Sequence, residues 1–243
     1  MTRPVMLNID EHKDLRVITD RSEAYGDNTW FALTFPLEFR TLQAYYPIFF
    51  QKHAETGRFL AIALLGLREG ENLFLEGDRW TVPYIPLSIK REPFLIGHQK
   101  VTVDGQERVE RVIHIDMDNP RVNSDSGERL FMEFGGNSPY LDKVADMLDA
   151  IHHGLGQADD FMGALERHEL LESFTLEVQL ENNDKHQLVG LHTINEDKLG
   201  QLDGEALAEL HAKGYLASIY MVLASHSNVM KMLAAKNKQV SAA

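Results

Sequence analysis

Two residues of the chain, His114 and Asp116, have the types and the spacing of two ligands of a non-haem iron site. In oxygenases with such a site, a histidine from elsewhere in the sequence completes a facial triad and leaves positions on the iron open. His186 or His192 could supply that third ligand. The pair lies at the end of a predicted strand, and among 11 histidines an H-x-D spacing arises easily by chance. We therefore favour an ordinary strand end and keep an iron- and 2-oxoglutarate-dependent oxygenase as the alternative.

A second group of candidates lies in the stretch 66–94, which reads GLREGENLFLEGDRWTVPYIPLSIKREPF. Its aromatic side chains could line a groove for a ligand or a peptide. The adjacent lysine and arginine could hold a carboxylate or a phosphate. The competing interpretation, which we favour for the aromatic residues, is that they pack as one layer of the core. The binding candidates are Trp80, Tyr84, Lys90, Arg91 and Phe94.

The acidic loop 116–128 has the residue types of a calcium site but not the spacing. A calcium loop needs oxygen ligands at alternate positions, a central glycine and a terminal glutamate. Pro120 and Arg121 interrupt that pattern, so we expect a solvated loop. The carboxylates in question belong to Asp116, Asp118, Asp125 and Glu128.

The composition limits the classes of function that the chain can have. Its 243 residues include no cysteine, which excludes disulfides, zinc-thiolate sites and cysteine nucleophiles. A formal net charge of −13 repels nucleic acid, so we expect no nucleic-acid partner. The sequence has no G-x-S-x-G elbow and no phosphate-binding glycine loop, and we expect no cofactor.

The hydropathy pattern predicts no membrane span. The longest apolar run, 59–67, is far shorter than the roughly 20 residues that a spanning helix needs. The first residues carry no apolar leader segment, so we expect a cytoplasmic protein.

The secondary structure that the sequence predicts changes near residue 137, from mainly strands to mainly helices. Residues 1–136 are expected to form a mainly antiparallel β region with short helices. The run 59–66 is typical of a strand buried on both faces, and a buried helix is the alternative that its periodicity leaves open. Residues 100–116 predict a hairpin whose turn is Asp104–Gly105.

Residues 137–243 predict a helical region that contains one β-hairpin, and the two regions are expected to form one compact unit. Ser138 and Pro139 are typical of a helix N-terminus, and Asp203 caps a further short helix. Blocks of strands and helices without regular alternation predict an α+β fold. We expect helices at about 139–151, 157–170 and 215–236, and hairpin strands at 174–180 and 186–194.

The segment 45–94 resembles the signature of the bacterial SapC family. The family pattern has a Y-P before an F-x-K, then T-G-x-F, G-L, N-L-F, a Trp, and Y-I-P leading to R-x-P-F. Later blocks, RLFMEFGGNSPYL, LVGLHTINEDKLGQL and LHAKGYLASIYMVLASH, are similar to the family's later blocks, so the resemblance covers about 30–235. The matching residues are Tyr46-Pro47, Phe50, Lys52, Thr56-Gly57, Phe59, Gly66-Leu67, Asn72-Leu73-Phe74, Trp80, Tyr84-Ile85-Pro86, Arg91 and Pro93-Phe94.

The resemblance implies a bacterial protein for which no catalytic residues are established. The family name comes from genes linked to a bacterial surface layer. Relatives tend to be encoded near halogenase-like proteins, cupin-type oxygenases and TonB-dependent receptors. The resemblance therefore favours a non-catalytic accessory protein with a protein or peptide partner, and an enzyme that uses His114 and Asp116 is the alternative.

Overall fold

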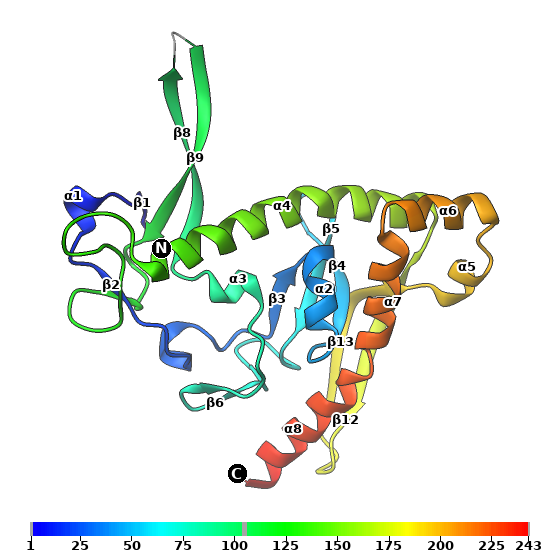
Figure 1. Ribbon diagram of the computed structural model, residues 1–243. Helices are drawn as coiled ribbons and strands as arrows, with labels where there is room; N and C mark the ends of the chain where they lie inside the picture. Colours follow the sequence, from blue (N-terminus) through cyan, green and yellow to red (C-terminus); the bar gives the residue numbers. More distant parts are fainter. Residues whose placement is uncertain (1, 104–105, 243) are drawn as a thin grey trace. The chain divides into compact units, whose positions relative to one another are not determined.

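The computed structural model describes residues 2–103 and 106–242 as a mixture of helices and antiparallel strands (Figure 1). This confirms the predicted α+β class. The chain divides into two compact units, and each unit is built from several separate segments. Unit 1 comprises Met1–Asp27, Gly77–Arg79 and Leu87–His153, and unit 2 comprises Asn28–Glu76, Trp80–Pro86 and Gly154–Ala243.

The elements of unit 1 are mostly strands. They are β1 (Pro4–Met6), α1 (Ile9–His12), β2 (Arg16–Val17), a 3₁₀ turn (Glu23–Tyr25), α3 (Leu87–Lys90), β8 (Phe94–Val103), β9 (Gln106–Asp116), β10 (Val122–Asn123) and β11 (Glu128–Arg129). Helix α4 (Pro139–Arg167) begins in unit 1 and ends in unit 2.

The elements of unit 2 are one large sheet and several helices. They are β3 (Phe31–Thr34), α2 (Pro36–Leu42), β4 (Ile48–Lys52), β5 (Phe59–Leu64), β6 (Leu75–Glu76), β12 (Leu171–Gln179), β13 (Lys185–Ile194), α5 (Glu196–Gly200), α6 (Gly204–Ala212), α7 (Tyr215–Ser225) and α8 (Asn228–Ala242). The short β7 (Arg79–Trp80) lies at a boundary between segments of the two units.

The core of unit 1 forms between a three-stranded sheet and the first half of α4. The strand order is β1-β9-β8, and Phe94 and Ile115 are register partners on the face that is buried. Leu141, Val144 and Leu148, which share one face of α4, pack in the same apolar cluster. The apolar spacing on α4 therefore determines which face of the helix packs against the sheet.

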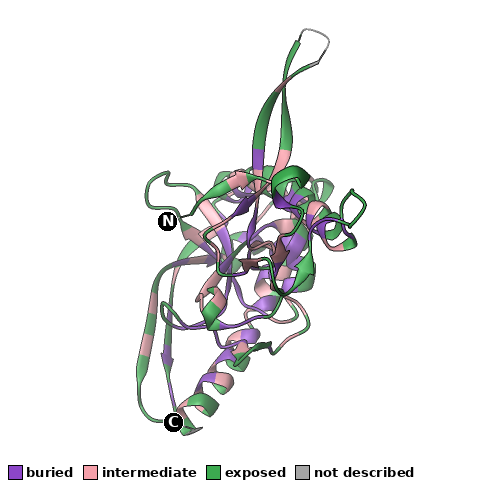
Figure 2. Cartoon of the chain, turned by 90° about the vertical axis from the view of Figure 1, so that its left-hand side faces the viewer, coloured by how far each residue is buried: buried purple, intermediate pink, exposed green. Residues whose placement is uncertain are grey.

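Strands β8 and β9 extend well beyond this core as a two-stranded hairpin. We call residues 98–103 and 106–111 the arm. Its described side chains are nearly all exposed, whereas the residues at the base of the hairpin are buried or half-buried (Figure 2). The predicted hairpin is confirmed, but β8 begins at Phe94 and not at Lys100, because Phe94–Gln99 pair with Glu110–Ile115. The predicted turn, Asp104–Gly105, lies outside the described residues.

The core of unit 2 is built on a five-stranded antiparallel sheet with the order β12-β13-β4-β5-β3. The apolar run 59–66 supplies β5, an internal strand with β4 on one side and β3 on the other, as predicted. The predicted hairpin at 174–180 and 186–194 is confirmed as β12 and β13. Phe161 on α4 is fully buried, and its ring contacts those of Phe39 and Tyr215.

The prediction of two helices over 139–151 and 157–170 was wrong, because α4 is continuous from Pro139 to Arg167. Gly154 was interpreted as a helix end. A Cβ at this position would lie 2.1 Å from the ring of Phe35, so the glycine permits close packing and does not end the helix.

The prediction of one helix over 215–236 was also wrong, because α7 ends at Ser225 and α8 begins at Asn228. The side chains at the break bind the backbone of β4. Ser225 Oγ accepts a hydrogen bond from Ile48 N at 2.8 Å, and His226 Nε2 donates to Ile48 O at 3.1 Å. Ser225 and His226 therefore hold the break between α7 and α8 against β4 of the sheet.

The helices of the described part of the chain include none that is both long enough and apolar enough to cross a membrane.

Candidate functional site

The five predicted binding residues fall in different units. Trp80 and Tyr84 belong to unit 2, whereas Lys90, Arg91 and Phe94 belong to unit 1. A groove formed by all five stays a prediction. What the structure gives is the environment of each side chain within its own unit.

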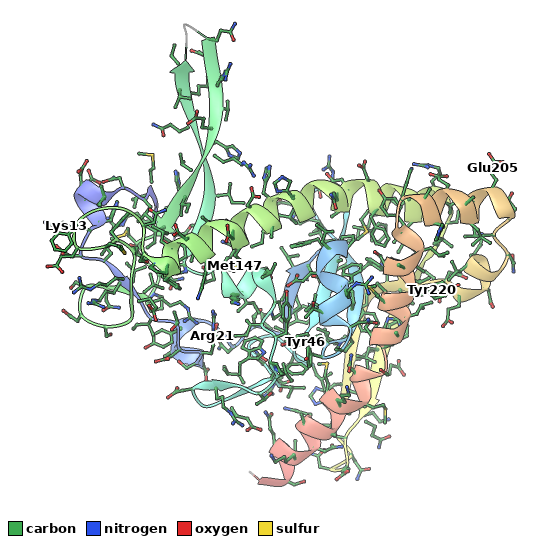
Figure 3. The ribbon with its side chains drawn as sticks, in the orientation of Figure 1. Lys13, Arg21, Tyr46, Met147, Glu205 and Tyr220 are labelled. Atoms are coloured by element: carbon green, nitrogen blue, oxygen red, sulfur yellow. The ribbon has the colours of Figure 1, made fainter. Side chains whose placement is uncertain are left out.

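In unit 2, Trp80 and Tyr84 take part in a chain of internal hydrogen bonds. Trp80 Nε1 donates to Tyr46 Oη at 2.7 Å, and the Tyr46 hydroxyl donates to the Tyr84 carbonyl oxygen. Tyr84 Oη donates to the buried carboxylate of Glu38 at 2.8 Å. Burial raises the pKa of Tyr46 and of Tyr84 well above the usual value, so both phenols stay neutral. Figure 3 labels Tyr46 among the side chains of unit 2. The side-chain polar atoms of Trp80 and Tyr84 are thus hydrogen-bonded within unit 2.

In unit 1, the predicted cations have different surroundings. Arg91 is half-buried, donates to the carbonyl oxygen of Phe94 at 2.7 Å and lies 3.3 Å from the carboxylate of Glu92. Phe94 is fully buried in the core of unit 1. Lys90 is exposed at the end of α3. Arg91 therefore stabilises the turn to which it belongs. Of Lys90, Arg91 and Phe94, only Lys90 is exposed.

A buried ion cluster in unit 1 was not found from the sequence. Arg121 is fully buried, and its Nη2 lies 2.6 Å from the carboxylate of Asp27. Its Nη1 donates to the carbonyl oxygens of Ile18 and Asp20. Arg21, labelled in Figure 3, pairs with the same carboxylate at 3.2 Å, and burial together with the charge of Arg121 lowers its pKa. The cluster is buried and joins Arg121 to the segment 18–27.

The two candidate iron ligands, His114 and Asp116, both lie on β9. The Asp116 carboxylate is buried and accepts hydrogen bonds from the backbone N–H groups of Arg3, at 2.7 Å, and Asp118, at 3.2 Å. The His114 ring lies against Gly97, where a Cβ would come within 2.3 Å of it. Within residues 2–103 and 106–242, no three histidine, aspartate or glutamate side chains are grouped as metal ligands. His186 and His192 belong to unit 2, on β13.

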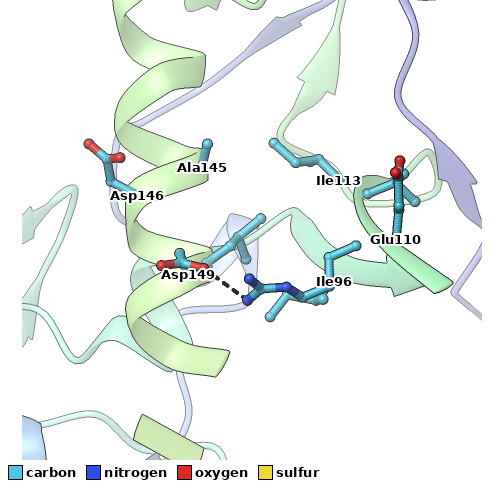
Figure 4. Close-up of a pocket in the computed structure, with 9 residues that line it drawn as sticks. Ile96, Glu110, Ile113, Ala145, Asp146 and Asp149 are labelled. Atoms are coloured by element: carbon cyan, nitrogen blue, oxygen red, sulfur yellow. Dashed lines mark hydrogen bonds and ion pairs between the residues drawn. The ribbon is translucent and has the colours of Figure 1, made fainter. Parts of the chain in front are cut away.

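A hollow of about 530 Å³ lies in unit 1 where the arm leaves the core (Figure 4). Its floor is apolar and comes from two elements that are distant in sequence. Ile96 and Ile113 are register partners on β8 and β9, and they continue the row of side chains that Phe94 and Ile115 begin. The other side is formed by α4. The helix contributes Ala145 and Leu148.

The rim of the hollow is charged. Arg111, the first arm residue of β9 above the base, donates from Nη1 to Asp149 Oδ1 on α4 at 2.8 Å (Figure 4). Glu110 and Asp146 also line the hollow and are exposed, and the Asp146 side chain lies on the side of α4 away from the strands (Figure 4). An apolar floor with a few charged groups around it is the composition of a site for a side chain of a partner molecule.

Strand β8, which contributes Ile96 to this hollow, has a free outer edge among the described residues. β8 is the last strand of its sheet, so its outward backbone groups have no neighbouring strand among the described residues. Asp116 N donates to Pro93 O at 3.0 Å, and hydrogen-bonded pairs alternate along the regular β8–β9 register. The backbone N–H and C=O groups that point to the free edge therefore belong to Ile96, His98, Lys100 and Thr102.

Comparison with known proteins places the chain in a family. The family model for SapC matches residues 7–232, which is most of the chain. No curated protein and no solved structure matches it. On the strength of the family match, this chain belongs to the SapC family.

Proposed function

We propose that this protein is a non-catalytic binding protein that accepts an extended segment of a partner protein as an additional strand on β8. The observation that carries the proposal is the free edge of β8, a strand whose Ile96 lines a hollow of about 530 Å³. In strand addition of this kind, main-chain hydrogen bonds give affinity, and pockets for alternate side chains give specificity. Strand β8 contributes to both components here.

The free edge supplies the main-chain part of the site. The outward backbone groups of Ile96, His98, Lys100 and Thr102 form a row to which an antiparallel or parallel strand can pair. Lys100 and His98 are exposed on this edge. Charged and polar side chains on an edge strand disfavour indiscriminate pairing between copies, so the edge can be kept open for a specific partner.

The hollow supplies the side-chain part of the site. Its volume lies within the range of about 300–1,000 Å³ that is usual for small-molecule pockets. Successive side chains of an added strand point to opposite faces, so every second one would face α4. One of these side chains would lie over Ile96, Ala145 and Leu148.

The exposure of the arm also supports a partner. A two-stranded hairpin alone is marginally stable in water, and three strands or a packed face are needed for independent stability. The arm is two-stranded and has few buried side chains in the described part of the chain. A third strand from a partner would supply the additional strand pairing that the arm lacks.

The resemblance to the SapC family suggests where the partner segment is to be sought. Halogenase-like proteins, cupin-type oxygenases and components of TonB-dependent uptake are the candidate partners, and a cytoplasmic location is part of the same proposal. We do not propose the alternative enzyme that uses His114 and Asp116, since in the described part of the chain these two side chains are not grouped with a third candidate metal ligand.

Filling the hollow tests the proposal. Short random peptides displayed on phage are selected on the immobilised full chain, and the enriched peptides are then synthesised. We expect Ala145→Phe to weaken their binding about tenfold or more, which corresponds to about 1.4 kcal/mol, because the new ring occupies the floor of the hollow. Titration calorimetry measures the dissociation constants, and thermal unfolding verifies that the variant is folded.

Ala150→Phe is the matched control, because it adds the same ring to an exposed position of the same helix outside the hollow. It should bind the peptides like the unmodified protein. The proposal fails if no peptide is enriched, or if the Ala145→Phe variant binds them as tightly as the control.

A further inference from the structure

We infer that the segment added to β8 carries an acidic residue, an aspartate or a glutamate, directly opposite Lys100. The inference rests on the proposed strand addition and specifies the partner: an extended segment with a carboxylate on the same face as the side chain that lies in the hollow. It follows from the side chains that share one face of the arm.

The register of β8 and β9 places basic side chains on one face of the arm. Side chains alternate between the two faces of a strand pair, so His98 and Lys100 lie on the same face as Ile96. The partner of His98 on β9 is Arg111, which lies on this face as well and pairs with Asp149 on α4. The face that begins at the floor of the hollow therefore continues along the arm with basic side chains.

Lys100 is the cation of this face whose charge has no ion pair. Arg111 is already neutralised by Asp149 at 2.8 Å. The residue opposite Lys100 on β9 is Val109, which is apolar. Lys100 is exposed, and among the ion pairs of the described residues none includes it. On the side of the free edge, Lys100 can therefore pair with a carboxylate that a partner supplies.

An added strand brings one of its own side chains next to Lys100. Residues directly opposite each other on neighbouring strands have their Cβ atoms about 4.5–5.5 Å apart. At this spacing a carboxylate is attracted by the ammonium group, whereas a second cation is repelled. Lys100 therefore acts in both directions: it disfavours pairing with the edge of a second copy, and it favours an acidic segment.

The acidity of the whole chain does not cancel this preference. The formal net charge of −13 is spread over 243 residues, and at physiological ionic strength exposed charges are screened over about 8 Å. Within the arm, one lysine and two arginines stand against two glutamates, which gives a formal charge of +1. A carboxylate next to Lys100 therefore interacts more strongly with the cationic arm than with the acidic remainder of the chain.

Charge variation along a selected peptide tests the inference. Each peptide position is made glutamate, glutamine and lysine in turn, and titration calorimetry measures the dissociation constants. We expect one position at which the glutamate form binds about threefold or more tightly than the lysine form, with the glutamine form between them. The residue that lies in the hollow is the one whose replacement by alanine has no effect in Ala145→Phe. The two positions should be an even number of residues apart, because both side chains lie on one face.

Lys100→Glu gives the complementary result on the protein. At the same peptide position it should reverse the order, so that the lysine form binds more tightly than the glutamate form. Arg108→Glu is the matched control, because it changes the net charge by the same amount on the opposite face of the arm. It should keep the order of the unmodified chain. Thermal unfolding verifies that both variants are folded.

The outcomes separate the inference from the proposed function. If the glutamate and lysine forms bind equally at every position, or if Lys100→Glu leaves the preference unchanged, the inference is wrong and strand addition stands. If Arg108→Glu reverses the order as Lys100→Glu does, the preference reflects net charge alone and the inference is also wrong. If no peptide binds, the proposed function fails, and the inference fails with it.

Discussion

Replacement of Arg121 by methionine is expected to lower the free energy of unfolding by about 3–5 kcal/mol. The Arg121 guanidinium is fully buried and lies 2.6 Å from the carboxylate of Asp27. Without it, the buried carboxylate of Asp27 loses its 2.6 Å ion pair and keeps the weaker contact with Arg21 at 3.2 Å. The carbonyl oxygens of Ile18 and Asp20 also lose their side-chain donor. Removal of one member of a buried ion cluster costs more than the cluster contributes as a whole, because the remaining charge stays desolvated.

Denaturation in urea followed by circular dichroism measures this loss. Arg108→Met on the arm is the matched control, because Arg108 is exposed on β9 and should change the free energy of unfolding by less than about 0.5 kcal/mol. A loss below about 1 kcal/mol for Arg121→Met would mean that the cluster is open to water and does not hold unit 1 together.

Replacement of Phe161 by alanine is expected to cost about 3–5 kcal/mol in unit 2. Phe161 is fully buried, and its ring centroid lies 6.0 Å from that of Phe39, 6.5 Å from that of Phe50 and 5.3 Å from that of Tyr215. These rings come from α2, β4 and α7, so the cavity left by alanine would lie where three elements meet α4. The surroundings can collapse only partly, which adds a cavity term to the lost transfer free energy.

The same substitution at an exposed phenylalanine is the control, because it removes a phenyl ring without opening a cavity in the core. Phe134 is 97% exposed, so Phe134→Ala should leave the midpoint of urea denaturation nearly unchanged. Equal midpoints for Phe161→Ala and Phe134→Ala would contradict the placement of α4 against the sheet of unit 2.

The sequence predicts those elements of the fold whose pattern is local. The alternation of apolar residues in 174–180 predicts β12. The continuous apolar run at 59–66 fits the internal strand β5, because a strand buried on both faces has no polar side, but the same run also fits a buried helix. The Asp203 side chain accepts a hydrogen bond from Ala206 N at the start of α6, as its residue type predicts.

Features that depend on distant contacts could not be predicted in this way. Gly154 has the residue type of a helix end, but its absent side chain leaves room for Phe35, which is more than 100 residues away. The ion cluster joins Arg121 to Asp27 across a separation of 94 residues. Nothing in the local pattern around either residue indicates such a pairing, since each lies in an irregular polar segment.

The strand side of the candidate site could be predicted from the sequence, but the helix side could not. A two-residue turn at Asp104–Gly105 implies that Val103 pairs with Gln106, and the same register then makes Ile96 the partner of Ile113. The sequence thus contained a signal for the strand side of the hollow. The helix side depends on how α4 packs against the sheet, and apolar spacing gives the buried face of a helix but not the strand that it covers.

The most direct test of strand addition is amide hydrogen exchange at the edge of β8, resolved by residue with NMR and measured with and without a selected peptide. Strand addition predicts that the outward amides of His98, Lys100 and Thr102 exchange at least about tenfold more slowly in the complex. Gln99 and Val101, whose amides already point to β9, should change much less. If a peptide binds and the exchange of His98, Lys100 and Thr102 is unchanged, strand addition on β8 is wrong.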